Sequence, residues 1–77
     1  MMSKWSYYHS MEDHSLYRAI GDSNIEYWSR MDKKWRMSSM DSLEDVRSLE
    51  RGSLSGPYEN LEDLENILPK HLFFDLI

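Results

Sequence analysis

Cysteine is absent from this chain of 77 residues, and its absence removes two common ways of stabilising a small domain. Without thiols no disulfide can cross-link the fold, and no zinc site built on cysteine ligands can form. Small secreted domains usually depend on disulfides, so we expect a reducing compartment, namely the cytoplasm. The length allows one domain, residues 1–77, which buries only about 60% of its unfolded surface. Self-association therefore stays open as a further source of buried surface.

Long apolar runs are also missing. The longest, Leu72–Phe74, falls far below the ~20 residues that a membrane span needs, and the first residues lack the apolar core of a signal peptide. We therefore predict no membrane association. A net charge of −5 is typical of a disordered chain, but three Trp, five Tyr and two Phe indicate a folded domain instead.

Catalytic motifs are missing as well. A glycine-flanked segment centred on Leu54 resembles a nucleophile elbow, but the central residue is not a nucleophile. His9 and His14 flank a predicted turn, where we expect both side chains to be solvated. Adjacent carboxylates such as Glu62 and Asp63 point in different directions on a helix, so they cannot share a proton. The sequence therefore predicts no enzymatic activity, no catalytic residues, no metal and no cofactor.

The residues that are present divide the chain into two parts. All three Trp and four of the five Tyr precede residue 41, and aromatic residues favour strands. We expect strands at residues 5–8, 16–20, 25–29 and 35–37. After residue 41 the apolar residues recur at spacings of three and four, which is the helical period.

These patterns predict an α+β fold. A small antiparallel sheet of three or four strands, a β-meander, covers about residues 4–38 and is followed by two short helices packed on one face. The helical part covers about residues 41–69, and an apolar tail covers residues 70–77.

Turn chemistry predicts the register of the sheet. Residues 21–24 and 30–33 both read as four-residue loops. These two loops would place Tyr17 opposite Trp28 and Trp28 opposite Trp35. The three rings would then form one row on a single face of the sheet, where cross-strand aromatic pairs stabilise the pairing.

Capping residues mark the helices. Ser42 followed by Asp45 fits an N-cap with an acid three residues later, and Gly52 fits a left-handed C-terminal cap. Residues 53–57 read as a loop, and residues 58–60 as a short additional strand. A second helix follows from about residue 60 and ends at Pro69. The predicted helical core consists of Leu43, Val46, Leu49, Leu64 and Ile67.

Charge is divided unevenly between the two parts. Residues 1–40 carry six Lys and Arg against five Asp and Glu, whereas residues 41–77 carry three against nine. Four of these acids, Glu59, Glu62, Asp63 and Glu65, fall within seven residues at helical spacings. An acidic surface of this kind attracts a basic partner and speeds the encounter.

Size, charge and the missing motifs are typical of the small acidic inhibitors that phages and mobile elements encode. We therefore expect a non-catalytic protein that binds a protein partner. That partner could be a basic nucleic-acid-binding protein whose groove the acidic surface occupies as a nucleic-acid mimic. An alternative interface is the apolar tail, with Phe73, Phe74 and Leu76. The tail would either dock on its own domain or make the protein a structural subunit that self-assembles.

A second alternative is a nucleic-acid-binding module built on the basic hairpin. Its residues are Arg30, Lys33, Lys34, Trp35 and Arg36. An aromatic ring among cations is typical of proteins that hold single strands. The net charge of −5 opposes direct binding to phosphate.

Overall fold

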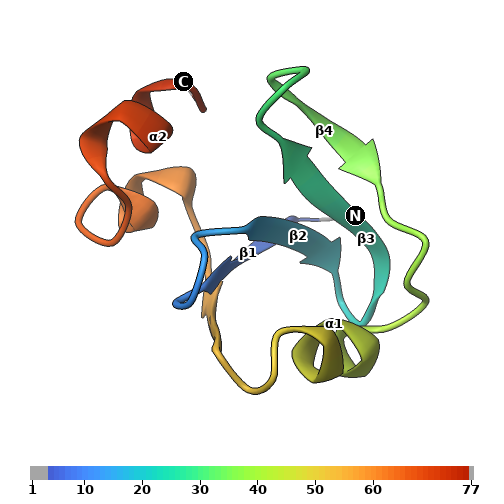
Figure 1. Cartoon of the computed structure of the whole chain (residues 1–77). Coiled ribbons are helices and arrows are strands. Elements are labelled where there is room, and N and C mark those ends of the chain that lie inside the picture. Colours follow the sequence, from blue (N-terminus) through green and yellow to red (C-terminus); the bar gives the residue numbers. More distant parts are fainter. Residues whose placement is uncertain (1–3, 77) are drawn as a thin grey trace.

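The computed structural model describes residues 4–76, which form a twisted sheet between two groups of short helices (Figure 1). The strands are β1 (Ser6–Ser10), β2 (Leu16–Ile20), β3 (Ser23–Ser29), β4 (Lys34–Met37) and β5 (Leu54–Tyr58). The helices are α1 (Leu43–Leu49), the 3₁₀ turn η1 (Leu61–Leu64) and α2 (Lys70–Phe74). The predicted α+β class is confirmed.

The sheet has five antiparallel strands in the order β4-β3-β2-β1-β5. Strands β1 to β4 form the predicted meander. The fifth strand, β5, lies beside β1 and is formed by a segment that we expected to be mostly loop. The sheet therefore has more strands than the three or four that we predicted. A Cβ at Gly56 would lie 2.7 Å from the carbonyl oxygen of Tyr7; only glycine lets β5 approach β1 so closely.

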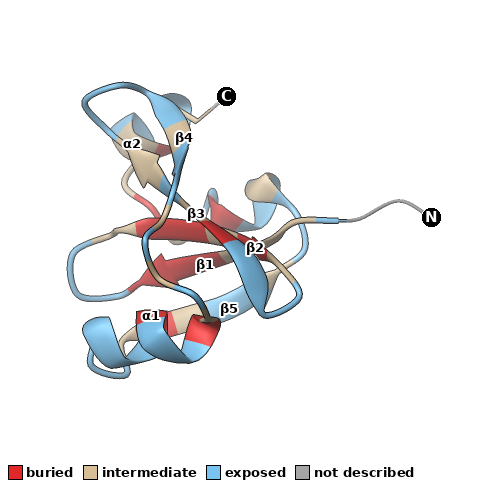
Figure 2. Ribbon diagram, turned by 90° about the vertical axis from the view of Figure 1, so that its right-hand side faces the viewer, coloured by how far each residue is buried: buried red, intermediate tan, exposed pale blue. Residues whose placement is uncertain are grey.

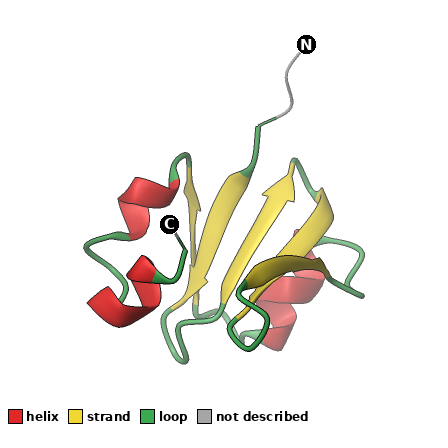
Figure 3. Ribbon diagram, turned by 90° about the horizontal axis from the view of Figure 1, so that it is seen from above, coloured by secondary structure: helices red, strands yellow, loops and turns green. Residues whose placement is uncertain are grey.

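Both faces of the sheet are covered. Because side chains alternate along a strand, Tyr8, Tyr17 and Ile25 lie on one face, in a buried cluster with Leu43 and Val46 of α1. The cluster on the other face comprises Leu16, Leu64, Leu68 and Phe73. Helices accordingly lie on both sides of the strands in Figure 3. The expectation of two helices on one face is wrong, because the strands present apolar side chains on both faces and each must be covered.

The register confirms one half of the predicted aromatic row and corrects the other. Trp28 lies opposite Trp35, as predicted, with ring centroids 5.5 Å apart. Tyr17, however, lies opposite Tyr27, which places Tyr17 and Trp28 on different faces. The turn between β2 and β3 is shorter than the predicted four residues, since β3 already begins at Ser23. In addition, the β2–β3 pairing shifts register between Arg18 and Ile20.

Helix α1 begins where the sequence predicts. The Ser42 side chain accepts a hydrogen bond of 3.3 Å from the backbone N–H of Asp45. Leu43 is buried, but Leu49 is 61% exposed, contrary to the prediction. In a helix Glu50 lies seven residues, or two turns, below Leu43, whereas Leu49 lies about 100° to the side. Glu50 therefore takes the buried position. Figure 2 shows α1 as mostly exposed, with buried residues among the exposed ones.

The second half departs further from prediction. The helix expected from about residue 60 is only the one-turn η1. Pro69 does not end a helix but is the N-cap of α2. This role suits proline, because its nitrogen needs no hydrogen-bond partner at a helix start. Ile67 is only partly buried, whereas Leu64 is fully buried. The tail docks on its own domain, because Phe73 lies in the buried cluster of that face.

Candidate functional site

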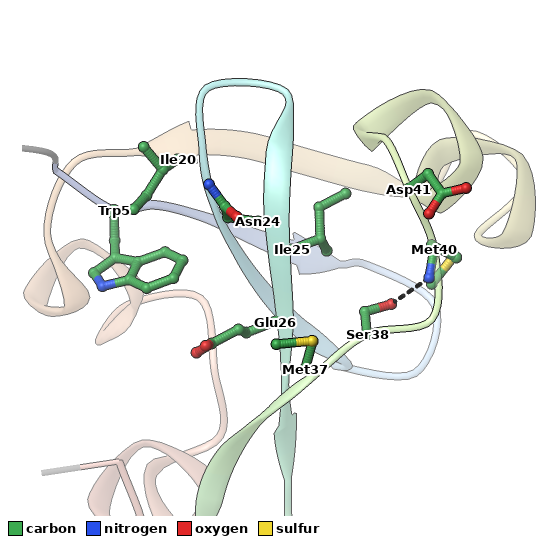
Figure 4. A pocket seen from close by; sticks show the side chains of 9 residues that line it. All are labelled: Trp5, Ile20, Asn24, Ile25, Glu26, Met37, Ser38, Met40 and Asp41. Atoms are coloured by element: carbon green, nitrogen blue, oxygen red, sulfur yellow. Dashed lines mark hydrogen bonds between the residues drawn. The ribbon is translucent and has the colours of Figure 1, made fainter.

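A pocket of about 370 Å³ opens at the end of the sheet where the β2–β3 turn meets the segment that leads from β4 to α1 (Figure 4). Its lining residues are Trp5, Ile20, Asn24, Ile25, Glu26, Met37, Ser38, Met40 and Asp41. The sequence analysis identified none of these as a site. No local pattern could have found them, because they come from the N-terminal segment, the β2–β3 hairpin and the β4–α1 connection.

The lining combines apolar walls with carboxylates. Five of the nine lining residues are Trp, Ile or Met, two are acidic, and none is Lys or Arg. Figure 4 shows Glu26 on the side of Trp5 and Asp41 at the other end, beside Met40. Met37 is 84% exposed at the rim. The pocket can therefore accept a group that is apolar along its length and positively charged at an end.

A stacked arginine lies next to this pocket. The guanidinium carbon of Arg18 is 4.1 Å from the ring centroid of Trp5 and 4.7 Å from that of Trp35. Arg18 donates from Nε and Nη2 to Glu26 Oε1, at 2.8 and 2.6 Å. Both bonds go to one oxygen, so Oε2 of Glu26 has no hydrogen bond recorded within residues 4–76.

The predicted acidic surface is only partly free. Glu59 pairs with Lys4 at 3.8 Å, although both side chains are largely exposed. Asp63 accepts a bond of 3.3 Å from the backbone N–H of Asn60 and so caps η1. Glu62 and Glu65 are exposed, and neither forms an ion pair in the part of the chain that the structure describes. Of the four predicted acids, these two have neither an ion pair nor a side-chain hydrogen bond among the described residues.

The residues of the apolar tail have different environments. Phe73 is 5% exposed and packs in the core, whereas Phe74 is 61% exposed. Leu76 is partly buried against the same cluster. Of the three residues suggested as an apolar interface, only Phe74 presents most of its side chain to solvent.

The cations of the basic hairpin are largely committed to internal contacts. Arg30 donates to the carbonyl oxygens of residues 13 and 14, at 2.9 Å each, and Lys33 pairs with Asp75 at 3.6 Å. Arg36 bonds Asp32, and that bond lowers the pKa of the Asp32 carboxyl.

The aromatic ring of that hairpin is also committed. Trp35 packs against the cluster beneath η1 and α2. Only Lys34, among the hairpin cations, has neither an ion pair nor a side-chain hydrogen bond recorded within the described residues. The hairpin does not present the row of free cations around an open ring that phosphate binding would need.

The two turn histidines are not solvated as expected. His9 is 2% exposed, and its Nε2 lies 2.8 Å from Nδ1 of His14, with the rings stacked. Nδ1 of His9 is buried without a partner among residues 4–76. Burial, and then the neighbouring His14, lower the pKa of His9, while Asp13 opposes them. His71 is exposed, as predicted.

This buried pair predicts a loss of stability in mild acid. A histidine whose pKa is lowered by folding takes up its proton more readily when unfolded. Its stabilising contribution is therefore complete above the unfolded pKa of about 6.5 and declines as pH falls below it. We expect the midpoint of urea unfolding to fall from pH 7.5 to pH 5.5, and His9→Gln to reduce that fall.

His71→Gln is the matched control, because that side chain is exposed. It should leave the pH dependence as in the parent protein. An unchanged acid dependence in His9→Gln would show that other groups control it.

The described residues contain no group of three or more His, Cys, Asp or Glu side chains that could hold a metal ion. Between residues 4 and 76 no helix has the length and apolar character needed to cross a membrane. No protein-family model, no curated protein and no solved structure matches this chain. Its function must be argued from its own geometry.

Proposed function

We propose that this protein is a non-catalytic inhibitor that binds a basic site on another protein in the cytoplasm of the host cell. A groove made for nucleic acid is such a site, and small inhibitors encoded by phages or mobile elements act in this way. The observation that carries the proposal is an asymmetry in how the two signs of charge are used on the surface.

The cations of β2, of β4 and of the β3–β4 turn are largely used within the domain, whereas Arg47, Arg51 and Lys70 are exposed and have no ion pair among the described residues. Arg18, Arg30, Lys33 and Arg36 contact carboxylates or carbonyl oxygens of the same chain. The exposed helical acids include Glu44, Asp45, Glu62 and Glu65, and none has an ion pair among the residues described. With a net charge of −5, the field that a partner meets is negative.

A negative field favours a basic protein partner over nucleic acid. Phosphate binding depends on cations that are free to replace counterions, and the hairpin offers few. A basic groove is attracted to exposed carboxylates, and such charges act mainly on the association rate. These considerations support protein binding and weigh against the nucleic-acid alternative.

Reversing the charge of Glu62 and Glu65 tests the proposal. The Glu62→Lys, Glu65→Lys double variant should associate about tenfold more slowly at low salt with a protein captured from host lysate, since steering depends on local charge. Its rate should also vary less with salt. Association and dissociation rates across an ionic-strength series provide the measurement.

The control is Glu44→Lys with Asp45→Lys on α1. It adds the same charge, moving the net charge from −5 to −1, but on the opposite face of the sheet. A similar loss in both variants would show that only total charge matters. An unaffected rate in the Glu62, Glu65 variant would refute the acidic contact surface.

A further inference from the structure

The pocket between Trp5 and Asp41 has a definite chemical character that the acidic surface alone does not explain. We propose that it receives an arginine side chain of the protein partner. This inference rests on the proposed function and adds to it the type of residue that the domain recognises.

The walls of the pocket fit the apolar stem of such a side chain. Ile20 and Ile25 contribute aliphatic surface from the two strands of one hairpin. Met37, at the end of β4, and Met40, in the segment that follows, contribute thioether side chains. Methionine is flexible and adapts to the shape of what it contacts. The methylene groups of arginine can be buried along such walls while its charge stays near the polar ends.

The polar groups of the pocket are suited to a cation. Glu26 has its Oε2 free, and the exposed Asp41 has no ion pair in the described chain. The Asn24 side chain adds an amide oxygen, and no lining residue carries a positive charge. Because Glu26 already pairs with Arg18, Asp41 is the lining carboxylate whose charge favours a positively charged guest, and Oε2 of Glu26 adds a further acceptor.

The adjacent stack shows how this surface holds a guanidinium. Arg18 lies between two indole rings while Glu26 accepts its hydrogen bonds. Trp5 and Glu26 line the pocket as well as contacting Arg18. A planar guanidinium donates to several separated acceptors and packs on aromatic rings, whereas a lysine ammonium is a compact and strongly hydrated charge. The chemistry of the site therefore favours arginine over lysine.

A titration with short peptides tests the assignment without knowledge of the partner. The probes are the blocked tripeptide Gly-Arg-Gly, its lysine analogue and its uncharged citrulline analogue, added to the isotopically labelled full chain. We expect the arginine peptide to shift the NMR signals of the Trp5 indole N–H and the Met37 and Met40 methyl groups. The lysine peptide should bind several-fold more weakly, and the citrulline peptide should cause no saturable shift.

Variants locate the site. Asp41→Asn should lower the affinity for the arginine peptide about threefold, which is the effect expected for the loss of one exposed ion pair. Glu12→Gln, which removes the same charge from an exposed position outside the pocket, should leave the affinity unchanged. Asp41 is exposed and makes no recorded side-chain hydrogen bond within residues 4–76, so the substitution should not disturb folding.

Three results would overturn the proposal. They are no NMR shift with the arginine peptide, equal affinity for the arginine and citrulline peptides, or an equal loss of affinity for the arginine peptide in the two variants. Equal affinity for lysine and arginine would refute the guanidinium assignment. If the arginine peptide does not bind the pocket, the charge-reversal test at Glu62 and Glu65 still decides the proposed function independently. Failure of that reversal, with the peptide still bound, would refute the acidic contact surface alone.

Discussion

Replacing Phe73 by alanine is expected to lower the free energy of unfolding by about 3–5 kcal/mol, whereas the same substitution at Phe74 should change it by less than about 0.5 kcal/mol. The two rings are adjacent in sequence, but Phe73 is 5% exposed and Phe74 is 61% exposed. Removing the buried ring leaves a cavity among Leu16, Leu64 and Leu68. Removing the exposed one leaves no cavity.

Urea unfolding followed by tryptophan fluorescence measures both variants, and each serves as the control of the other. Domains of this size have marginal stability, so Phe73→Ala should be largely unfolded under conditions where Phe74→Ala is native. Equal stability of the two variants would show that α2 does not dock on the sheet.

This difference also determines how the tail can be tested as an interface. Deleting residues 72–77 would remove a core residue together with an exposed one, so lost binding would only report lost folding. Phe74→Ala removes the exposed ring and keeps the core. A folded Phe74→Ala protein that no longer binds its partner would make the tail, and not the acidic surface, the contact.

The second large effect is expected at Tyr17, which joins the sheet to α1. Its hydroxyl donates to Glu50 Oε2 at 2.5 Å, and both residues are buried. Tyr17→Phe would leave a buried carboxylate without this donor. We expect a loss of about 1.5–3 kcal/mol, the range for a hydrogen bond to a charged group.

Tyr58→Phe is a suitable control for this measurement. The Tyr58 hydroxyl donates to Ser55 Oγ at 3.1 Å, a neutral and partly exposed bond, which should contribute about 1 kcal/mol or less. If the two substitutions destabilise equally in urea, the buried carboxylate has no special dependence on Tyr17.

The same bond predicts a loss of stability in alkali. Burial, and then the bond to Glu50, raise the pKa of the Tyr17 phenol well above its usual value of about 10. A group whose pKa is raised by folding stabilises the native state fully below the unfolded pKa, and this contribution declines as pH rises above it. Stability should therefore fall above pH ~10. Tyr17→Phe should reduce this fall, leaving the smaller contribution of Tyr8, whose pKa burial also raises.

Local sequence patterns determined the elements of the first half. Aromatic residues and the turns between them placed β1 to β4 to within about two residues. Ser42 marked the start of α1, which ends at Leu49, three residues before the predicted glycine cap at Gly52. Each of these features depends on neighbours within a few residues, since capping and strand preference are local. The acidic character of the second half was likewise evident from composition.

The tertiary structure decided the features that depend on distant partners. The two-residue connection at Gly21 and Asp22 shifts the pairing next to the turn by two residues, so that Ile20 lies opposite Ser23. The register shift between Arg18 and Ile20 then returns one residue, and the net change of one places Trp28 on the other face from Tyr17. A one-residue slip reverses every side chain of a strand, so this register shift placed Trp28 on the face that was not predicted. The sequence contained the signal for the short turn, since Gly-Asp is a two-residue hairpin connection, but no local signal for the register shift.

The candidate site was beyond local reasoning for a related reason. Trp5, Glu26 and Asp41 are distant in sequence, and only the hairpin twist and the β4–α1 connection bring them around one pocket. The edge pairing of β5 and the docking of Phe73 depend in the same way on a surface formed by other strands. Composition determined that this protein is acidic, aromatic and without catalytic motifs; long-range packing decided which of its charges are free and which ring of the tail faces solvent.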